Sequence, residues 1–167
     1  RVRFAASALA LRLSQRRVRS AARLNSGVRH HMKPIGKLAG KQLNSVESLE
    51  GCLCLMQFED SYKLYIESLW RLGNNKALLL TSEDDRQTYG LEAAIDAIAQ
   101  LRERLRGQRV SHAIANELTG DLTLIFSPSY LRFEVISSST GFEAWQIYQG
   151  TDIKYVAVGG GQIREWP

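Results

Sequence analysis

The sequence predicts an α/β fold in which strands and helices alternate and the strands form a parallel sheet. The main observation is the order of apolar segments after residue 50, which runs strand, helix, strand, helix, strand. A second observation is the composition: 167 residues, 44% hydrophobic and 23% charged, contain enough apolar material for one packed domain. The third is a basic N-terminal segment, which we expect to form an extended arm outside that domain.

The net charge of +5 combines two oppositely charged parts of the chain. Residues 1–46 contain eight Arg and three Lys, and the first acidic residue is Glu47. The other eleven basic residues and all seventeen acidic residues follow, which gives the remainder a net charge of −6. We therefore expect a basic arm and linker at 1–46 and a mildly acidic domain at 47–167.

The arm has the composition of a mitochondrial transit peptide, because it is rich in Arg, Ala, Ser and Leu and contains no acid. Its cationic stripe, at helical spacing, consists of Arg12, Arg16, Arg19 and Arg23. Such a stripe suits an import path, anionic lipid headgroups or acidic protein subunits. A disordered basic tail and an RNA-binding arm remain alternatives, since clustered Arg also neutralises phosphates. The chain begins without Met, so we expect an arm that can be retained after cleavage further upstream.

The strands and helices are predicted from apolar spacing and from turn residues. Strands are expected at 52–56, 77–80, 110–115 and 130–136, and residues 118–126 fit either element. A helix is expected at 91–105. A second helix is expected after Asp60, where one face consists of Tyr62, Tyr65, Ile66, Leu69 and Leu72.

Residues 33–45 contain Pro34, Gly36 and Gly40 and are interpreted as a linker. The two cysteines, Cys52 and Cys54, are expected to be buried on one face of a strand, where a disulfide between close neighbours is rare. The strand–helix order implies right-handed βαβ units, and no internal repeat is evident.

From residue 77 onward, a series of short segments can be followed along the chain. They are Leu78–Thr81, Tyr89–Glu92, Ala115-Asn116, Leu118–Asp121, Ser129–Phe133, Gly141-Phe142 and Gly159–Arg164. Their order and spacing resemble those of the crotonase (enoyl-CoA hydratase/isomerase) superfamily. Residues 51–167 therefore resemble a crotonase-like (ClpP/crotonase) domain. The resemblance implies a shortened domain, without the closing helices of that family, whose uncovered core is covered by another protein.

The resemblance implies a coenzyme A thioester held in an oxyanion hole by two backbone N–H donors. It assigns these vestigial donors to Leu91 and Gly120. It assigns the two catalytic carboxylates of the family to Thr123 and Gln146, neither of which can act as a base. We therefore expect no catalysis and no required cofactor, with at most vestigial binding of coenzyme A.

Other residues of the resembling region offer weaker chemistry. Tyr89 replaces a small residue near the expected thioester. Asp121, Glu117 and Glu92 are alternative bases, although a solvated carboxylate is the commoner role and Glu92 also suits the first turn of a helix. His112 is interpreted as a strand residue. No metal site is predicted, because His30 and His31 lack further ligands.

The sequence thus predicts a noncatalytic accessory subunit of a mitochondrial assembly, on the matrix side and peripheral to an inner-membrane complex. No apolar run is long enough to span a bilayer. A respiratory-chain complex, NADH:ubiquinone oxidoreductase, is preferred because the acidic body disfavours broad contact with RNA. The alternatives are a mitochondrial ribosomal protein whose arm binds rRNA, and a divergent acyl-CoA hydratase, isomerase or thioesterase.

Overall fold

A computed structural model describes residues 31–167 of the chain, except for the side chain of Cys52. The chain divides into two compact units, 1–32 and 33–167, and the second unit holds the described core. The four arginines of the predicted stripe and His30 lie outside the described residues.

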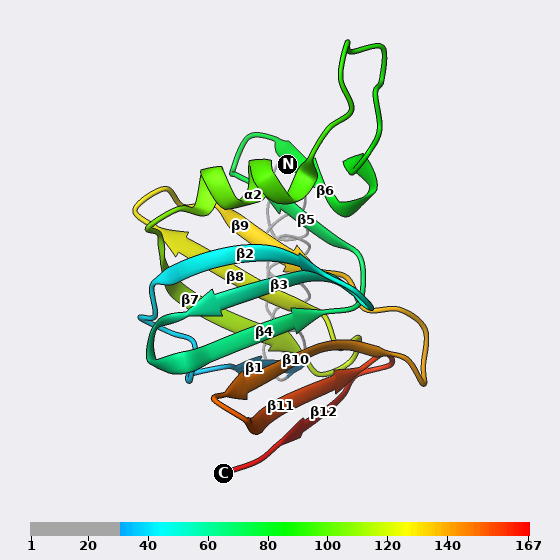
Figure 1. Ribbon diagram of the computed structural model, residues 1–167. Coiled ribbons are helices and arrows are strands. Elements are labelled where there is room, and N and C mark those ends of the chain that lie inside the picture. Colours follow the sequence, from blue (N-terminus) through cyan, green and yellow to red (C-terminus); the bar gives the residue numbers. More distant parts are fainter. Residues whose placement is uncertain (1–30) are drawn as a thin grey trace, which may run out of the picture. The chain divides into compact units, whose positions relative to one another are not determined.

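Strands dominate the described part of the chain, and they form two six-stranded sheets (Figure 1). In spatial order, the first sheet consists of β1 (Met32–Pro34), β7 (Arg109–Asn116), β8 (Leu122–Ser127), β9 (Arg132–Val135), β5 (Trp70–Gly73) and β6 (Leu78–Thr81). The second consists of β12 (Gln162–Glu165), β11 (Asp152–Val158), β10 (Glu143–Gln149), β4 (Tyr62–Ile66), β3 (Cys52–Phe58) and β2 (Leu43–Leu49). Neighbouring strands run antiparallel.

This architecture overturns the predicted α/β fold and the crotonase-like resemblance. The helix expected after Asp60 is wrong: the segment forms β4 and β5, where Tyr62, Leu64 and Ile66 are buried at every second position. Burial at every second residue is the pattern of a strand. The apolar residues of this segment also fit helical spacing, which is why a helix was predicted. The βαβ interpretation is wrong as well, because the strands on either side of the helix, β6 and β7, are separated in the sheet by β8, β9 and β5.

The expected strands at 52–56, 77–80, 110–115 and 130–136 are confirmed as β3, β6, β7 and β9, within a few residues at each end. The ambiguous segment 118–126 contributes β8. The 3-10 turns η2 (Glu59–Ser61) and η3 (Ser82–Asp84) follow β3 and β6.

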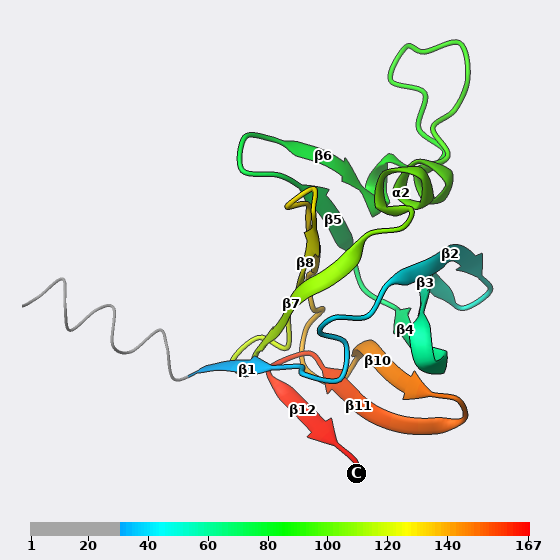
Figure 2. The same ribbon diagram turned by 90° about the vertical axis from the view of Figure 1, so that its left-hand side faces the viewer.

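The one described α-helix, α2 (Ala97–Leu105), is shorter than the 91–105 predicted. Asp96 precedes it and caps the helix, because its side chain accepts a hydrogen bond from Ala99 N at 2.8 Å. Its buried face lies across one end of the two sheets, against β2 and β6 (Figure 2). No helix among the described residues is long and apolar enough to cross a membrane.

The two sheets bury their facing side chains in one core. Its largest fully buried members are Trp70, Trp145, Phe58, Phe126, Phe133, Ile35, Leu38, Met56, Leu64, Ile66, Leu72 and Leu101. Ile35 and Leu38 belong to the segment predicted as a linker, and Leu43 is also buried, so residues 33–45 are part of the domain. Cys54 is buried as predicted.

The strand order repeats, although no internal repeat is evident from the sequence. In the first half, β2–β3–β4 forms a meander in one sheet and β5–β6 continues in the other. In the second half, β7–β8–β9 forms a meander in the first sheet and β10–β11 continues in the second, so the two sheets have exchanged roles. The halves meet where β9 pairs with β5 and β10 pairs with β4.

The pairing registers of the two halves agree in detail. Met56 pairs with Leu64 in the first half, as Leu124 pairs with Phe133 in the second. The irregularity between Leu43 and Ser45 recurs between Val110 and His112, and that between Leu72 and Gly73 recurs between Ile147 and Tyr148. A short sequence signature accompanies this: Phe58-Glu-Asp-Ser-Tyr62 and Phe126-Ser-Pro-Ser-Tyr130. Trp70 and Trp145 are therefore equivalent residues.

Candidate binding cleft

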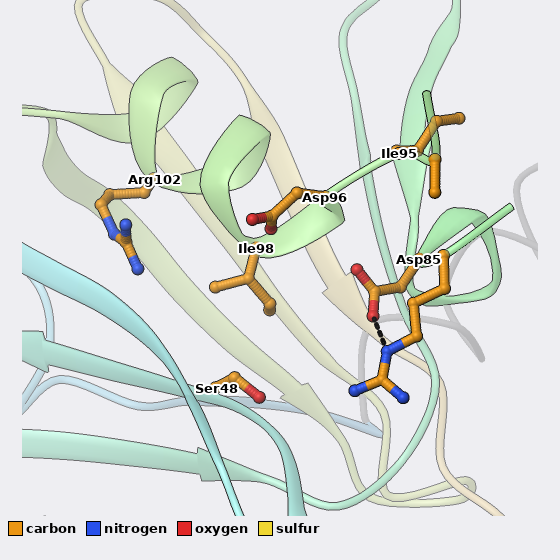
Figure 3. A pocket seen from close by; sticks show the side chains of 8 residues that line it. Ser48, Asp85, Ile95, Asp96, Ile98 and Arg102 are labelled. Atoms are coloured by element: carbon orange, nitrogen blue, oxygen red, sulfur yellow. Dashed lines mark ion pairs between the residues drawn. The ribbon is translucent and has the colours of Figure 1, made fainter. Parts of the chain in front are cut away.

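A cleft lies where the β2–β3 hairpin, η3 and the start of α2 meet, and we call it the hairpin–helix cleft (Figure 3). It consists of two adjoining cavities of about 410 Å³ and 330 Å³. Both are lined by Ser48, Asp85, Arg86 and Ile98. Leu53 and Trp70 add apolar surface to the smaller cavity, and Arg102 lines the larger one.

The carboxylates of the cleft are engaged in holding helix α2. Asp85 accepts a hydrogen bond from Ala97 N at 3.0 Å, and Asp96 caps the helix through Ala99 N. These two carboxylates accept hydrogen bonds from backbone N–H groups that have no partner within the helix, because they lie in its first turn. Neither carboxylate is thus placed as a free base.

The arginines of the cleft keep donors available. Arg102 donates from Nε to the Val46 carbonyl oxygen at 2.7 Å, which fixes the side chain against β2. Its Nη groups make no hydrogen bond with the described residues. Arg86 lies 3.6 Å from Asp85 through Nε, but its side chain is 92% exposed, so this ion pair contributes little to stability.

Trp70 has the least satisfied polar group of the cleft. Its side chain is only 2% exposed, and its Nε1–H is buried without an acceptor among the described residues. The equivalent Trp145 donates from Nε1 to the Gly120 carbonyl oxygen at 2.7 Å. A buried donor without an acceptor costs about 1–3 kcal/mol of folding free energy. Trp70 carries this cost and Trp145 does not.

A protruding loop, residues 86–95, rises beside the cleft between β6 and α2 (Figure 1). Two hydrogen bonds close its base, from Arg86 N to Ile95 O and from Ile95 N to Gln87 O, each 2.8 Å. Beyond them Tyr89 and Leu91 are 67% and 60% exposed. Large apolar side chains held out on a closed loop are typical of contact residues.

The structure does not bring the predicted oxyanion donors together. Leu91 lies in the protruding loop, and its N–H already donates to Thr88 O at 2.7 Å. Gly120 lies in the β7–β8 turn rather than at a helix start, with φ +84°, and its N–H donates to Asn116 O at 2.7 Å. Both N–H groups are used by the turns that contain them.

Thr123 and Gln146 lie in different sheets, on β8 and β10. Gln146 donates from Nε2 to Glu67 at 2.9 Å and also bonds to Glu143 and to the Tyr148 hydroxyl. Burial raises the pKa of Glu67, and the charge of Glu143 raises it further. Gln146 therefore bridges two acids on the sheet surface.

The alternative bases have structural positions. Asp121 accepts a hydrogen bond from Ser137 N at 2.8 Å, Glu117 is exposed in the β7–β8 turn, and Glu92 lies in the protruding loop instead of a first helical turn. His112 is exposed on β7 with Nδ1 3.2 Å from the Ser111 hydroxyl. His31 is exposed too, and no cluster of His, Cys, Asp and Glu suited to a metal occurs among the described residues.

Trp70, Arg102 and the hairpin were not identified from the sequence. The one available signal was the repeated Phe-x-x-Ser-Tyr segment followed by a Trp, which marks Trp70 and Trp145 as a pair. The two segments share few other residues, so the repeat becomes visible only through strand pairing.

Comparison with known proteins gives one match. A family model, described as a family of unknown function (DUF6188), matches residues 34–167, which is nearly the whole described domain. No curated protein and no solved structure matches the chain. The cleft, the protruding loop and both tryptophans lie within the matched residues, and the chain belongs to the DUF6188 family.

Proposed function

We propose that residues 33–167 form a noncatalytic protein-binding module, in which the protruding loop and the hairpin–helix cleft receive a partner protein. The observation that carries this proposal is the exposure of Tyr89 and Leu91 on a loop closed at its base, next to a cleft with apolar surface. Aromatic and aliphatic side chains on a preformed loop contribute binding energy with little loss of conformational entropy.

The chemistry of the cleft supports binding rather than catalysis. Its two acids hold the start of α2, so moving a proton with either of them would weaken the helix they cap. The cleft instead has hydrogen-bond donors without an acceptor among the described residues: the Arg102 Nη groups, and Trp70 Nε1, which is buried.

The assembly to which this module contributes is a separate part of the proposal. The composition of residues 1–32, with eight Arg and no acidic residue, supports a mitochondrial location and a noncatalytic role in a large complex of that compartment. Fractionation of cells that express the full chain tests the location. Migration with a respiratory complex on a native gel supports the preferred assembly, and nuclease-sensitive sedimentation supports the ribosomal alternative.

Site-specific photo-crosslinking tests the binding surface. A photoreactive amino acid at Leu91 in the full chain should yield a discrete protein adduct in cells. The same group at Ile153, on β11 and four strands from β2 in its sheet, should not. Filling the cleft with Ser48→Phe should abolish the adduct, whereas Asn44→Phe on the same strand should not. Equal adducts from both crosslinking positions, or an adduct that survives Ser48→Phe, would contradict the proposal.

A further inference from the structure

The two halves of the domain place a tryptophan at the same point, just after the chain crosses between sheets. Trp70 opens β5 and pairs with Val135, while Trp145 lies in β10 and pairs with Ile66. Val135 and Ile66 are themselves equivalent, since they pair with Leu122 and Cys54 at matching registers. The surroundings of one tryptophan can therefore be compared directly with those of the other.

Around Trp145 the chain supplies its own acceptor. The β7–β8 turn spans residues 117–120 and directs the Gly120 carbonyl to the indole N–H at 2.7 Å. The turn Gly159–Gly161 then packs on this one so closely that a Cβ at Gly161 would overlap the Glu117 carbonyl oxygen. The position is thus filled by backbone of the same chain.

Around Trp70 the equivalent acceptor is missing. The β2–β3 hairpin is closed by Glu50 and Gly51 alone, since Leu49 already pairs with Cys52. This tighter connection supplies no carbonyl to Trp70, whose Nε1–H is buried without an acceptor among the described residues. Ser48 and Leu53, which flank the hairpin end, line the 330 Å³ cavity together with Trp70.

We propose that this cavity receives a peptide segment of the partner protein, and that a backbone carbonyl of that segment accepts a hydrogen bond from Trp70 Nε1. The contact repeats the one that Gly120 makes with Trp145 inside the chain. An apolar side chain of the segment packs on Leu53 and Ile98. This inference rests on the proposed function, because it names the chemistry by which the same cleft holds its partner.

The polar groups at the rim favour a carbonyl-rich occupant over a cationic one. Asp85 and Asp96 are already used by backbone N–H groups of α2. The side chains that still offer donors are Arg86, Arg102 through its Nη groups, and Ser48 on β2 through its exposed hydroxyl. An extended peptide offers a carbonyl oxygen at each residue, so successive carbonyls can meet these donors.

The indole N–H signals of the full chain test this inference by ¹H–¹⁵N NMR. The probe is N-acetyl-leucine N-methylamide, which has two amide carbonyls and one apolar side chain, and the control compound is 4-methyl-1-pentanol, which has no carbonyl. Assignment uses Trp70→Phe, Trp145→Phe and Trp166→Phe. The amide should move the Trp70 signal downfield in a saturable manner and leave the Trp145 signal unchanged.

Variants distinguish loss of the Trp70 hydrogen bond from a change in the fold. Trp70→Phe should weaken binding of the amide by about five- to tenfold, the effect of one hydrogen bond. Ser48→Phe, which leaves Trp70 and the core intact, should abolish the shift, and Asn44→Phe should retain it. A Trp70 signal that does not move, or that moves equally with the alcohol, overturns the inference. The inference is also overturned if the amide does not bind. The proposed function is tested separately by the crosslinked adduct from Leu91.

Discussion

At the scale of single residues, the two tryptophans show how the same side chain can be satisfied in one half and not in the other. Both are buried in one core, so they contribute similar apolar area. They differ in the indole N–H, which has an acceptor only in Trp145. This difference should appear in the free energy of unfolding of variants at the two positions.

Trp145→Phe should lower the free energy of unfolding by more than Trp70→Phe, by about 1–3 kcal/mol. The first substitution leaves the buried Gly120 carbonyl without its donor, and the second removes a donor that had no acceptor. Urea denaturation of both variants measures the difference. Equal losses would mean that Trp70 Nε1 is satisfied in the free protein.

Glycine 161 illustrates a position where space and backbone conformation both exclude a side chain. Its φ is +87°, and an added Cβ would overlap the Glu117 carbonyl oxygen and the Leu118 backbone. Gly90 has nearly the same φ, +84°, but open space around it. The pair isolates the effect of packing.

Gly90→Ala should cost about 1–2 kcal/mol, the penalty of the left-handed conformation, and Gly161→Ala should cost at least about 2 kcal/mol more. Thermal unfolding followed by circular dichroism gives both values. Similar losses for the two variants would show that the β11–β12 turn can move away from the β7–β8 turn.

At the scale of elements, one ion pair fastens the segment before β2 to β7 and η2. Arg109 forms two hydrogen bonds to the Glu59 carboxylate, at 2.7 and 2.9 Å, and also donates to Gly40 O and Gln42 Oε1. The hydrogen bonds from Arg109, and secondly one from Gln42 N, lower the pKa of Glu59 below its ordinary value. The contact is exposed, so we expect a modest effect.

A carboxyl whose pKa is lowered by folding stabilises the protein above its unfolded pKa and loses that contribution as the pH falls through the folded pKa. Glu59→Gln should therefore flatten the fall in stability between about pH 5 and pH 3 relative to the wild type. Urea midpoints at several pH values measure this slope. Glu50→Gln, in the exposed hairpin turn, is the control and should keep the wild-type slope.

At the scale of the whole molecule, we expect the domain to fold without the basic N-terminal residues. All buried core residues of the described chain lie between Ile35 and Ala157. The compact unit and the matched family region also begin at Lys33 and Pro34. Removing residues 1–31 should therefore leave the midpoint of thermal unfolding of the domain within about 2 °C of the full chain. A larger fall would mean that the arm packs on the domain.

Local sequence was sufficient for some elements. The apolar runs that became β3, β6 and β7 are short and bounded by turn residues, and the buried face of helix α2 lies within the nine residues Ala97–Leu105. These features depend on neighbours in the sequence, so they could be predicted from it. The segment of β4 and β5 could not, because a strand of period two and a helix of period 3.6 share several apolar positions over so short a stretch.

What the sequence alone determined is the charge division, the mainly apolar composition of the core segments and the positions of β3, β6, β7 and β9. Tertiary structure alone decided that the sheets are antiparallel and that the chain repeats itself with the sheets exchanged, because pairing between strands distant in sequence depends on contacts that no local pattern encodes. The same contacts decided the candidate site. Whether a buried tryptophan has an acceptor depends on the length of a turn in another part of the fold, and this is why the indole N–H of Trp145 has an acceptor and that of Trp70, which lines a cavity, has none among the described residues.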